Sequence, residues 1–190
     1  MSHADPYRIA RESIRKGHAH ELLELSSELV RSENSALHPS GYLMRGMAYE
    51  IGSEELDVDL ERAAASYRKA VSLAPDTITY LFLARALMKM GGDQRLGALR
   101  YIQEAEAIRM EPEVSLAYAR YYECARQDYR MARRHYRDAA LAGRFPGFFG
   151  YAAMSRKLKQ PGRALAVDAL RILLGPVLFL LLGTRASKGL

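Results

Sequence analysis

The chain has a single cysteine among its 190 residues and no tryptophan. Because it is the single cysteine, Cys124 cannot form an internal disulfide, and a metal site built from several cysteines is excluded. Residues 1–15 contain no apolar run that could act as a signal peptide. No stretch alternates apolar and polar residues with the β-branched enrichment that is typical of strands. We therefore expect an all-α protein in the cytoplasm.

The sequence also lacks an even distribution of charge. Residues 1–108 carry 13 Lys or Arg against 16 Asp or Glu, whereas residues 109–190 carry 15 against 6. The net charge therefore changes from −3 in the first part to +9 in the second. This asymmetry predicts an oriented interaction of the basic part with an anionic partner; the alternative is a solvated arginine-rich face without a partner.

A repeat of about 34 residues organises the chain. Four times an alanine precedes a bulky side chain by four positions, at steps of 35, 34 and 34 residues: Ala63/Tyr67, Ala98/Ile102, Ala132/Tyr136 and Ala166/Leu170. This period is the length of a helix–turn–helix repeat. The alanines are expected where two helices cross closely, because a small side chain lets the backbones approach.

Prolines and glycines predict the boundaries of the repeats. Pro39, Pro75, Pro112 and Pro146 each follow an apolar-periodic stretch and are expected to end a helix there. Five helical hairpins result, with the first turning at Gly17 and the fifth turning at residues 160–162: about 6–31, 39–74, 77–110, 113–142 and 146–175. We group them as an N-terminal helical hairpin (1–38), a repeat array (39–175) and an apolar and basic tail (176–190).

The second hairpin carries a recognisable pattern. Its residues read Tyr42-x2-Arg45-Gly46-x2-Tyr49, followed by Ala63-x3-Tyr67-x2-Ala70-Val71-x-Leu73-x-Pro75. This resembles the tetratricopeptide repeat, although Arg45 stands where leucine is usual. Residues 128–143 look like the Sel1-like variant of the same superfamily. The resemblance implies a right-handed α-solenoid of about five helix–turn–helix hairpins with an apolar C-terminal tail segment.

The resemblance also implies a function. In tetratricopeptide proteins the first helix of each hairpin lines a concave groove that holds a protein or peptide, so we expect a non-catalytic adaptor or scaffold. The positions that match the groove are Met47, Glu50 and Ile51; Arg85, Met88 and Lys89; Arg120, Glu123 and Cys124; and Tyr151, Met154 and Ser155. Alternatively, several of these side chains pack against neighbouring helices.

Residues that could carry chemistry are few. The chain has no P-loop and no glycine-rich dinucleotide fingerprint. His18 and His20 are two positions apart, so a helix would not place both rings on one face. Cys124 is read as a buried or half-buried small apolar residue and His135 as part of a solvated face. We expect no catalytic residue, no cofactor and no metal site.

An arginine-rich stretch suggests a weaker alternative. Basic residues alternate with tyrosines from Tyr118 to Arg144, a combination that can bind single-stranded nucleic acid. Four arginines are expected on the outer face of a helix: Arg130, Arg133, Arg134 and Arg137. The chain would then be a nucleic-acid-binding regulator.

The C-terminal tail is apolar and bordered by basic residues. Residues 172–183 contain no charge, and the most apolar part comprises Val177, Leu178, Phe179, Leu180, Leu181 and Leu182. Such a short run caps the solenoid or attaches the chain to a membrane or a partner. We favour the second interpretation, with a cytoplasmic protein that is peripheral or tail-anchored at the membrane face. The competing interpretation is a soluble homo-oligomer with the tail buried in its interface.

Overall fold

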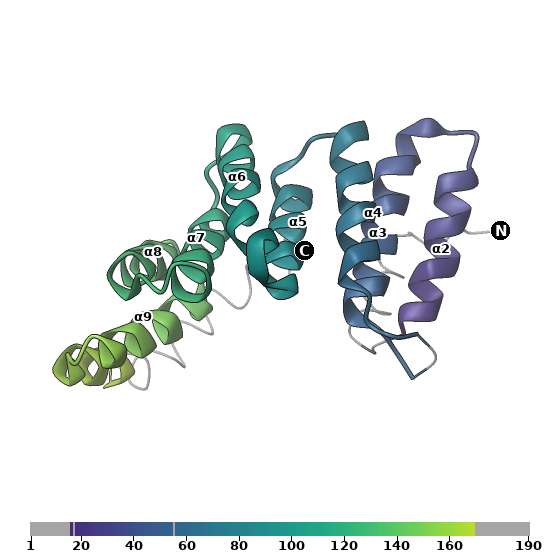
Figure 1. Cartoon of the computed structure of the whole chain (residues 1–190). Helices are drawn as coiled ribbons and strands as arrows, with labels where there is room; N and C mark the ends of the chain where they lie inside the picture. The colour runs from purple at the N-terminus through teal and green to yellow at the C-terminus, as the bar shows by residue number, and fades with distance from the viewer. Residues whose placement is uncertain (1–15, 17, 55, 170–190) are drawn as a thin grey trace. The chain divides into compact units, whose positions relative to one another are not determined.

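The computed structural model describes residues 16, 18–54 and 56–169 (Figure 1). The predicted all-α fold of successive helical hairpins is confirmed, and the described residues contain no strand. The helices are α2 (Ala19–Arg31), α3 (His38–Ile51), α4 (Leu60–Leu73), α5 (Thr77–Met90), α6 (Gly92–Ile108), α7 (Pro112–Cys124), α8 (Tyr129–Leu141) and α9 (Phe145–Lys157), with a short 3-10 helix at Ser35–Leu37. Residues 161–169 are also helical. The chain divides into two compact units, Met1–Arg109 and Met110–Leu190.

The prolines begin helices as well as separating them. Pro39, Pro112 and Pro146 occupy the first turn of α3, α7 and α9. A proline fits there because the first backbone N–H groups of a helix have no intrahelical acceptor. Asp76 is the N-cap of α5 and accepts a hydrogen bond from the backbone N–H of Thr79. Each hairpin boundary therefore combines a stop for one helix with a start for the next.

In the first unit, consecutive helices from α2 to α6 pack against one another (Figure 1). The predicted pairs Ala63/Tyr67 and Ala98/Ile102 are fully buried. Close approach also depends on Gly46 of α3, since an added Cβ would lie 2.4 Å from the ring of Tyr67. The small residues therefore act where the repeat pattern placed them, at helix crossings.

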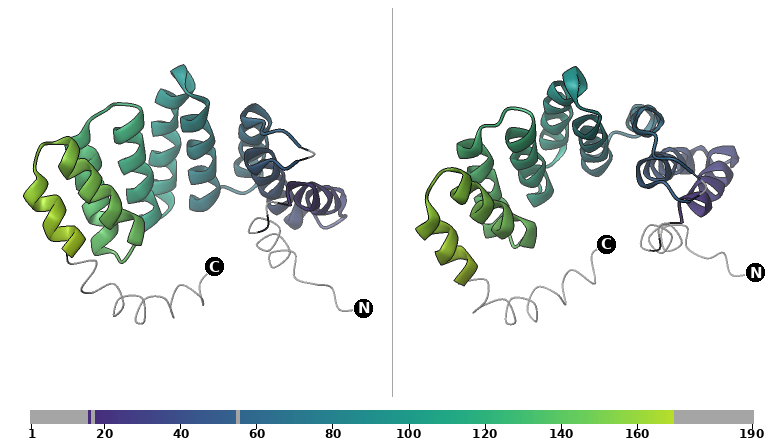
Figure 2. Two further views of the ribbon diagram at one scale, coloured as in Figure 1. Left: turned by 90° about the horizontal axis from the view of Figure 1, so that it is seen from below. Right: turned by 60° about the horizontal axis from the view of Figure 1, so that its bottom comes forward.

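In the second unit, α8 packs against both α7 and α9 (Figure 2). Ala132 is fully buried and Tyr136 nearly so, which matches the repeat pattern. The pattern fails in the fifth hairpin, where Ala166 is exposed and Ala164 is buried instead. Two residues correspond to about 200° around a helix, so turning Ala164 inward necessarily turns Ala166 outward. The turn before this helix lies at residues 158–160, and the helix begins at Pro161.

Some sequence predictions lie outside the described residues. They are the first half of the N-terminal hairpin, its turn at Gly17, Leu170 of the fourth alanine pair, the end of the fifth hairpin (170–175), and the tail residues Val177, Leu178, Phe179, Leu180, Leu181 and Leu182. Within the described part of the chain, no helix has both the length and the apolar character needed to cross a bilayer.

Candidate functional site

A buried carboxylate joins three helices of the first unit. The side chain of Glu50, on α3, is only 2% exposed. It accepts a 2.8 Å hydrogen bond from the hydroxyl of Tyr67 on α4 and two 2.7 Å hydrogen bonds from Nε and Nη2 of Arg85 on α5. Nζ of Lys89 lies 2.9 Å from the same carboxylate. We call these four residues the Glu50 cluster.

The protonation states in the Glu50 cluster follow from burial and charge. Burial by itself would raise the pKa of Glu50, but the hydrogen bonds and charge of Arg85, together with Lys89 and Tyr67, outweigh it and hold the pKa below its usual 4.5. Burial and the neighbouring Glu50 charge raise the pKa of the Tyr67 phenol. The carboxylate is therefore ionised and the phenol protonated at neutral pH, as the hydrogen bonds require.

The cluster orients its two cations toward the surface. The guanidinium of Arg85 lies 4.4 Å from the centre of the Phe82 ring, and that ring stacks on Tyr67. Even so, the Arg85 side chain remains 38% exposed and that of Lys89 remains 51% exposed. The inner edge of each cation is thus fixed by Glu50, while the outer edge stays in contact with water.

The first helices of the second and third hairpins also carry apolar side chains at predicted groove positions. Met88 is half-buried on α5, and Ile51 is exposed at the end of α3. Met47 is half-buried and packs against the core formed by α2 and α3. Among the groove positions of the first unit, Glu50 is therefore buried and holds the two cations. The side chains that remain accessible, which we call the accessible rim, are Ile51, Arg85, Met88 and Lys89.

The second unit repeats part of this arrangement. Glu123 on α7 accepts a 2.7 Å hydrogen bond from the hydroxyl of Tyr136 on α8, and Nζ of Lys157 on α9 lies 3.0 Å away. Burial, the hydrogen bond and the charge of Glu123 raise the pKa of Tyr136. The hydrogen bond to Glu123 also raises the pKa of Lys157. This pair is more open, because the side chains of Glu123 and Lys157 are 24% and 44% exposed.

The remaining predicted groove residues of the second unit divide between surface and core. Arg120 is exposed, and so is Cys124, which corrects the expectation that this cysteine is covered. Tyr151 is half-buried, with the guanidinium of Arg133 5.8 Å from its ring centre. Met154 and Ser155 are fully buried, because the face of α9 that carries them packs on α7 and α8. They therefore belong to the core and are not part of an accessible surface.

His135 does not lie on a solvated face. It is half-buried, and its ring stacks on Tyr118 at 5.0 Å and on Tyr122 at 5.5 Å between centroids. The residue occupies the side of α8 that faces α7, whereas its neighbour Arg134 is exposed. The aromatic rings of α7 explain this placement, since they provide a flat apolar surface for the imidazole.

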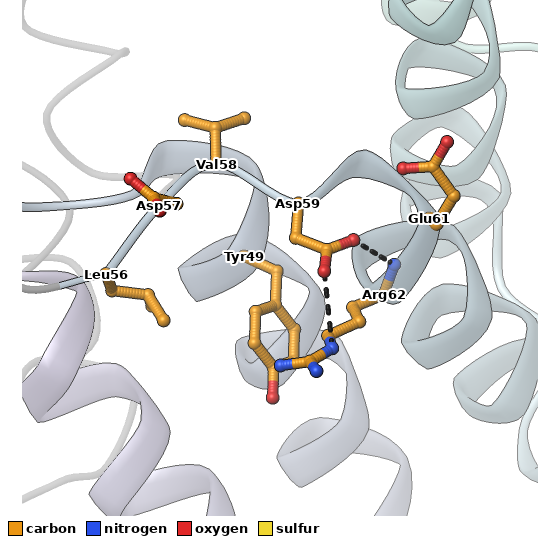
Figure 3. Close-up of a pocket in the computed structure, with 7 residues that line it drawn as sticks. All are labelled: Tyr49, Leu56, Asp57, Val58, Asp59, Glu61 and Arg62. Atoms are coloured by element: carbon orange, nitrogen blue, oxygen red, sulfur yellow. Dashed lines mark hydrogen bonds and ion pairs between the residues drawn. The ribbon is translucent and has the colours of Figure 1, made fainter.

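An open hollow of about 630 Å³ lies beside the turn between α3 and α4. Figure 3 shows that Asp59 accepts from the backbone N–H of Arg62 and pairs with its side chain, whose guanidinium covers the ring of Tyr49. Its lining is Tyr49, Leu56, Asp57, Val58, Asp59, Glu61 and Arg62. Asp59 serves as the N-cap of α4, so these contacts build the turn. Across the described residues, no group of three or more His, Cys, Asp or Glu side chains is placed to hold a metal ion.

Comparisons with known proteins agree with the repeat fold. No protein-family model matches the chain, and a search of curated proteins found no match. Among solved structures, MamA 41-end from Desulfovibrio magneticus RS-1 is similar with a TM-score of 0.67 at 17% identity, covering 90% of this chain and 94% of that chain. A MamA RS-1 ArsTM double mutant gives a TM-score of 0.66 at 17% identity, covering 90% and 93%. A further crystal structure of MamA gives 0.61 at 15% identity, covering 97% and 94%. The fold is thus an α-solenoid of helical hairpins, similar to that of the MamA structures.

Proposed function

We propose that this chain is a non-catalytic adaptor that holds a protein or peptide partner on the first helices of its hairpins. One observation carries the proposal. In the first unit, Glu50 fixes Arg85 and Lys89 so that both cations still face water, on first helices that also carry the half-buried Met88 and the exposed Ile51. A surface with orienting charge and adaptable apolar side chains suits a bound peptide.

The fixed geometry of Arg85 favours binding. An arginine that is free in solution loses rotamer entropy when a partner immobilises it, at about 0.5–1.5 kcal/mol for a flexible side chain. Arg85 has already lost much of that freedom, because Glu50 and Phe82 hold it. The exposed N–H groups are therefore preorganised for a carboxylate or a backbone carbonyl of the partner.

The second unit supports the same role with different residues. Arg120 and Cys124 are exposed on α7, and Tyr151 is half-exposed on α9. Arginine and tyrosine are enriched among residues that dominate binding energy. We therefore propose Arg120, Glu123 and Tyr151 as the partner-binding residues of the second unit. Those of the first unit are Met47, Glu50, Arg85, Met88 and Lys89.

The test uses the full chain and a peptide library displayed on phage. Selected peptides are expected to bind the wild type and to lose affinity at least fivefold with Met88→Ala or Arg120→Ala, since each removes an accessible side chain and leaves the Glu50 cluster intact. Leu96→Ala is the control, because Leu96 is 45% exposed but lies on the second helix of its hairpin. Equal affinity of all three variants for every selected peptide would contradict the proposed surface.

We further propose that the chain is cytoplasmic and held at a membrane by residues 176–190. The support is the uncharged sequence of residues 172–183 with its basic neighbours. Deleting residues 175–190 is expected to move the protein from the membrane pellet to the soluble fraction; an intact chain that is already soluble and monomeric would contradict this.

The Sel1-like character of the fourth hairpin is likewise a proposal, supported by Asp128, Ala132, Tyr136 and Gly143 at the spacing of that pattern.

A further inference from the structure

The outward face of α8 carries a row of arginines that ends in an exposed leucine. Arg130, Arg134, Arg137 and Leu141 follow one another at steps of four, three and four residues, so they lie along one side of the helix. All four are exposed, and Leu141 is 80% exposed. The opposite side of α8 is covered, as the burial of Ala132, Tyr136 and Ala139 shows. We call this row the α8 basic face.

The charge of this face is largely uncompensated. None of the described residues pairs with the guanidinium groups of Arg130 or Arg134, and Arg137 pairs only with its exposed neighbour Asp138. Residues 110–169 carry eleven Lys or Arg against six Asp or Glu. Other carboxylates of the unit are already engaged: Glu113 with Arg144, Glu123 with Lys157 and Asp168 with Arg156.

Arg133 does not belong to the α8 basic face, which corrects the grouping expected from the sequence. It donates a 2.6 Å hydrogen bond to Gln160 and lies over the ring of Tyr151. Its guanidinium therefore points along α9 and the following turn. The anion-binding capacity of α8 is carried by the three arginines of the row.

The aromatic residues of this region decide which anionic partner fits. Binding of single-stranded nucleic acid needs aromatic faces on which bases can stack. Here Tyr121 and Tyr136 are buried, Tyr122 stacks on His135, and Tyr129 lies under Nζ of Lys157 at 4.6 Å. These four tyrosine rings are thus buried or already in contact with another side chain, while the arginine row ends in an accessible aliphatic side chain.

We propose that the α8 basic face docks on a bilayer surface that carries anionic phospholipids. The arginines would contact lipid phosphates, and Leu141 would enter the boundary between headgroups and acyl chains, as on other basic amphipathic surfaces. This adds to the proposed adaptor function a membrane contact made by a helix of the repeat array itself. It does not depend on residues 176–190 or on the partner surface of the first helices.

The experiment measures sedimentation of the full-length chain with two kinds of vesicle. One contains phosphatidylcholine alone, and the other contains about 30% phosphatidylglycerol, which makes its surface moderately anionic. The wild type is expected to bind the anionic vesicles and to be released by salt, because screening shortens the range of these charges to about 10 Å at 0.1 M. Arg130→Gln/Arg134→Gln/Arg137→Gln should weaken binding roughly 10- to 100-fold, since each cation near such a surface contributes about fivefold. Leu141→Ser should cause a smaller loss of vesicle binding. This loss should not depend on the salt concentration, because Leu141 contributes through apolar contact rather than charge.

The matched control removes the same charge elsewhere. Arg68→Gln/Lys69→Gln/Arg100→Gln neutralises three exposed cations of the first unit and should bind anionic vesicles as the wild type does. Circular dichroism checks that both triple variants remain folded. Three results would overturn the proposal: no binding of the wild type to anionic vesicles, no loss of that binding in the triple arginine variant of α8, or equal losses in the two triple variants. Displacement of the bound vesicles by single-stranded RNA at equimolar phosphate would also overturn it. The peptide-binding test above uses other residues, so the two proposals can fail separately.

Discussion

Glu50 and Arg85 are 35 residues apart in the sequence and are joined by two hydrogen bonds of 2.7 Å. This separation is the length of one repeat, so the pair links the second hairpin to the third. Lys157 reaches Glu123 over 34 residues and links the fourth hairpin to the fifth in the same way. In both units a tyrosine on the intervening helix donates to the same carboxylate. Within each unit, the second hairpin is therefore connected to the third, and the fourth to the fifth, by polar contacts as well as by apolar packing.

Replacing the buried carboxylate should destabilise the first unit. Glu50→Gln keeps the shape of the side chain but leaves Arg85 and Lys89 without their counter-charge. We expect a loss of about 2–3 kcal/mol in the free energy of unfolding, somewhat below the value for a fully buried ion pair, because Arg85 is partly exposed. Urea-induced unfolding followed by circular dichroism measures the change.

The control for this variant is Glu104→Gln. Glu104 lies on α6, is exposed, and is 3.9 Å from Arg100. An exposed pair of this kind contributes little, so the free energy of unfolding should change by no more than about 0.5 kcal/mol. If the two glutamine variants unfold at the same urea concentration, the Glu50 cluster has no special part in stability.

The stability of the first unit should also depend on pH through Glu50. Its pKa in the folded chain is below the usual 4.5, so the unfolded state binds its proton more readily. The contribution of the carboxylate is complete above the unfolded pKa and disappears as the pH falls through the lower folded pKa. The difference in unfolding free energy between the wild type and Glu50→Gln should therefore shrink between pH 5 and pH 3. A difference that stays constant from pH 7 to pH 3 would show that folding does not lower the pKa of this carboxylate.

Close helix contact in the second unit depends on Gly147. A Cβ at this position would lie 2.4 Å from the backbone nitrogen of Ala140 and 2.6 Å from the carbonyl oxygen of Tyr136. Neither atom can move without shifting α8, so Gly147→Ala should cost about 1–3 kcal/mol in the free energy of unfolding. Gly97→Ala should instead stabilise the chain by about 0.5–1 kcal/mol, because Gly97 is inside α6 with open space around it. If urea unfolding shows that Gly147→Ala destabilises the chain and Gly97→Ala stabilises it, the close helix contact at Gly147 is confirmed. Stability changes of the same sign in the two variants would argue against it.

The fold could be predicted because each repeat gives the same local signals. Small residues at a constant period, prolines at the boundaries and apolar residues at helical spacing all indicated hairpins, and the structure contains them. Asp76 could even be assigned as an N-cap from its place before α5. These features depend on residues close in the sequence, where periodicity is informative.

The contacts at the candidate site were harder to foresee. The family pattern marks Glu50 and Met154 as groove positions, but it does not say that Glu50 is buried under two cations or that Met154 enters the core. One signal was present. The hairpins with glutamate at this position, at Glu50 and Glu123, also have tyrosine in the second helix, whereas the hairpin with Met88 has Ile102. Polar residues thus occur in pairs because a buried carboxylate needs a donor.

The alanine repeat itself provides a test that distinguishes the burial predicted by the sequence pattern from the burial observed in the structure. Ala132 and Ala166 occupy equivalent positions, 34 residues apart, so the pattern alone predicts that leucine is harmful at both. In the structure Ala132 is fully buried between helices and Ala166 is exposed. Ala132→Leu should therefore cost about 1–3 kcal/mol by overpacking, while Ala166→Leu should change the free energy of unfolding by no more than about 0.5 kcal/mol. Urea unfolding of the two variants compares them directly. A similar loss for both would restore Ala166 to a helix crossing and would place the last described helix in the register that the repeat pattern predicts.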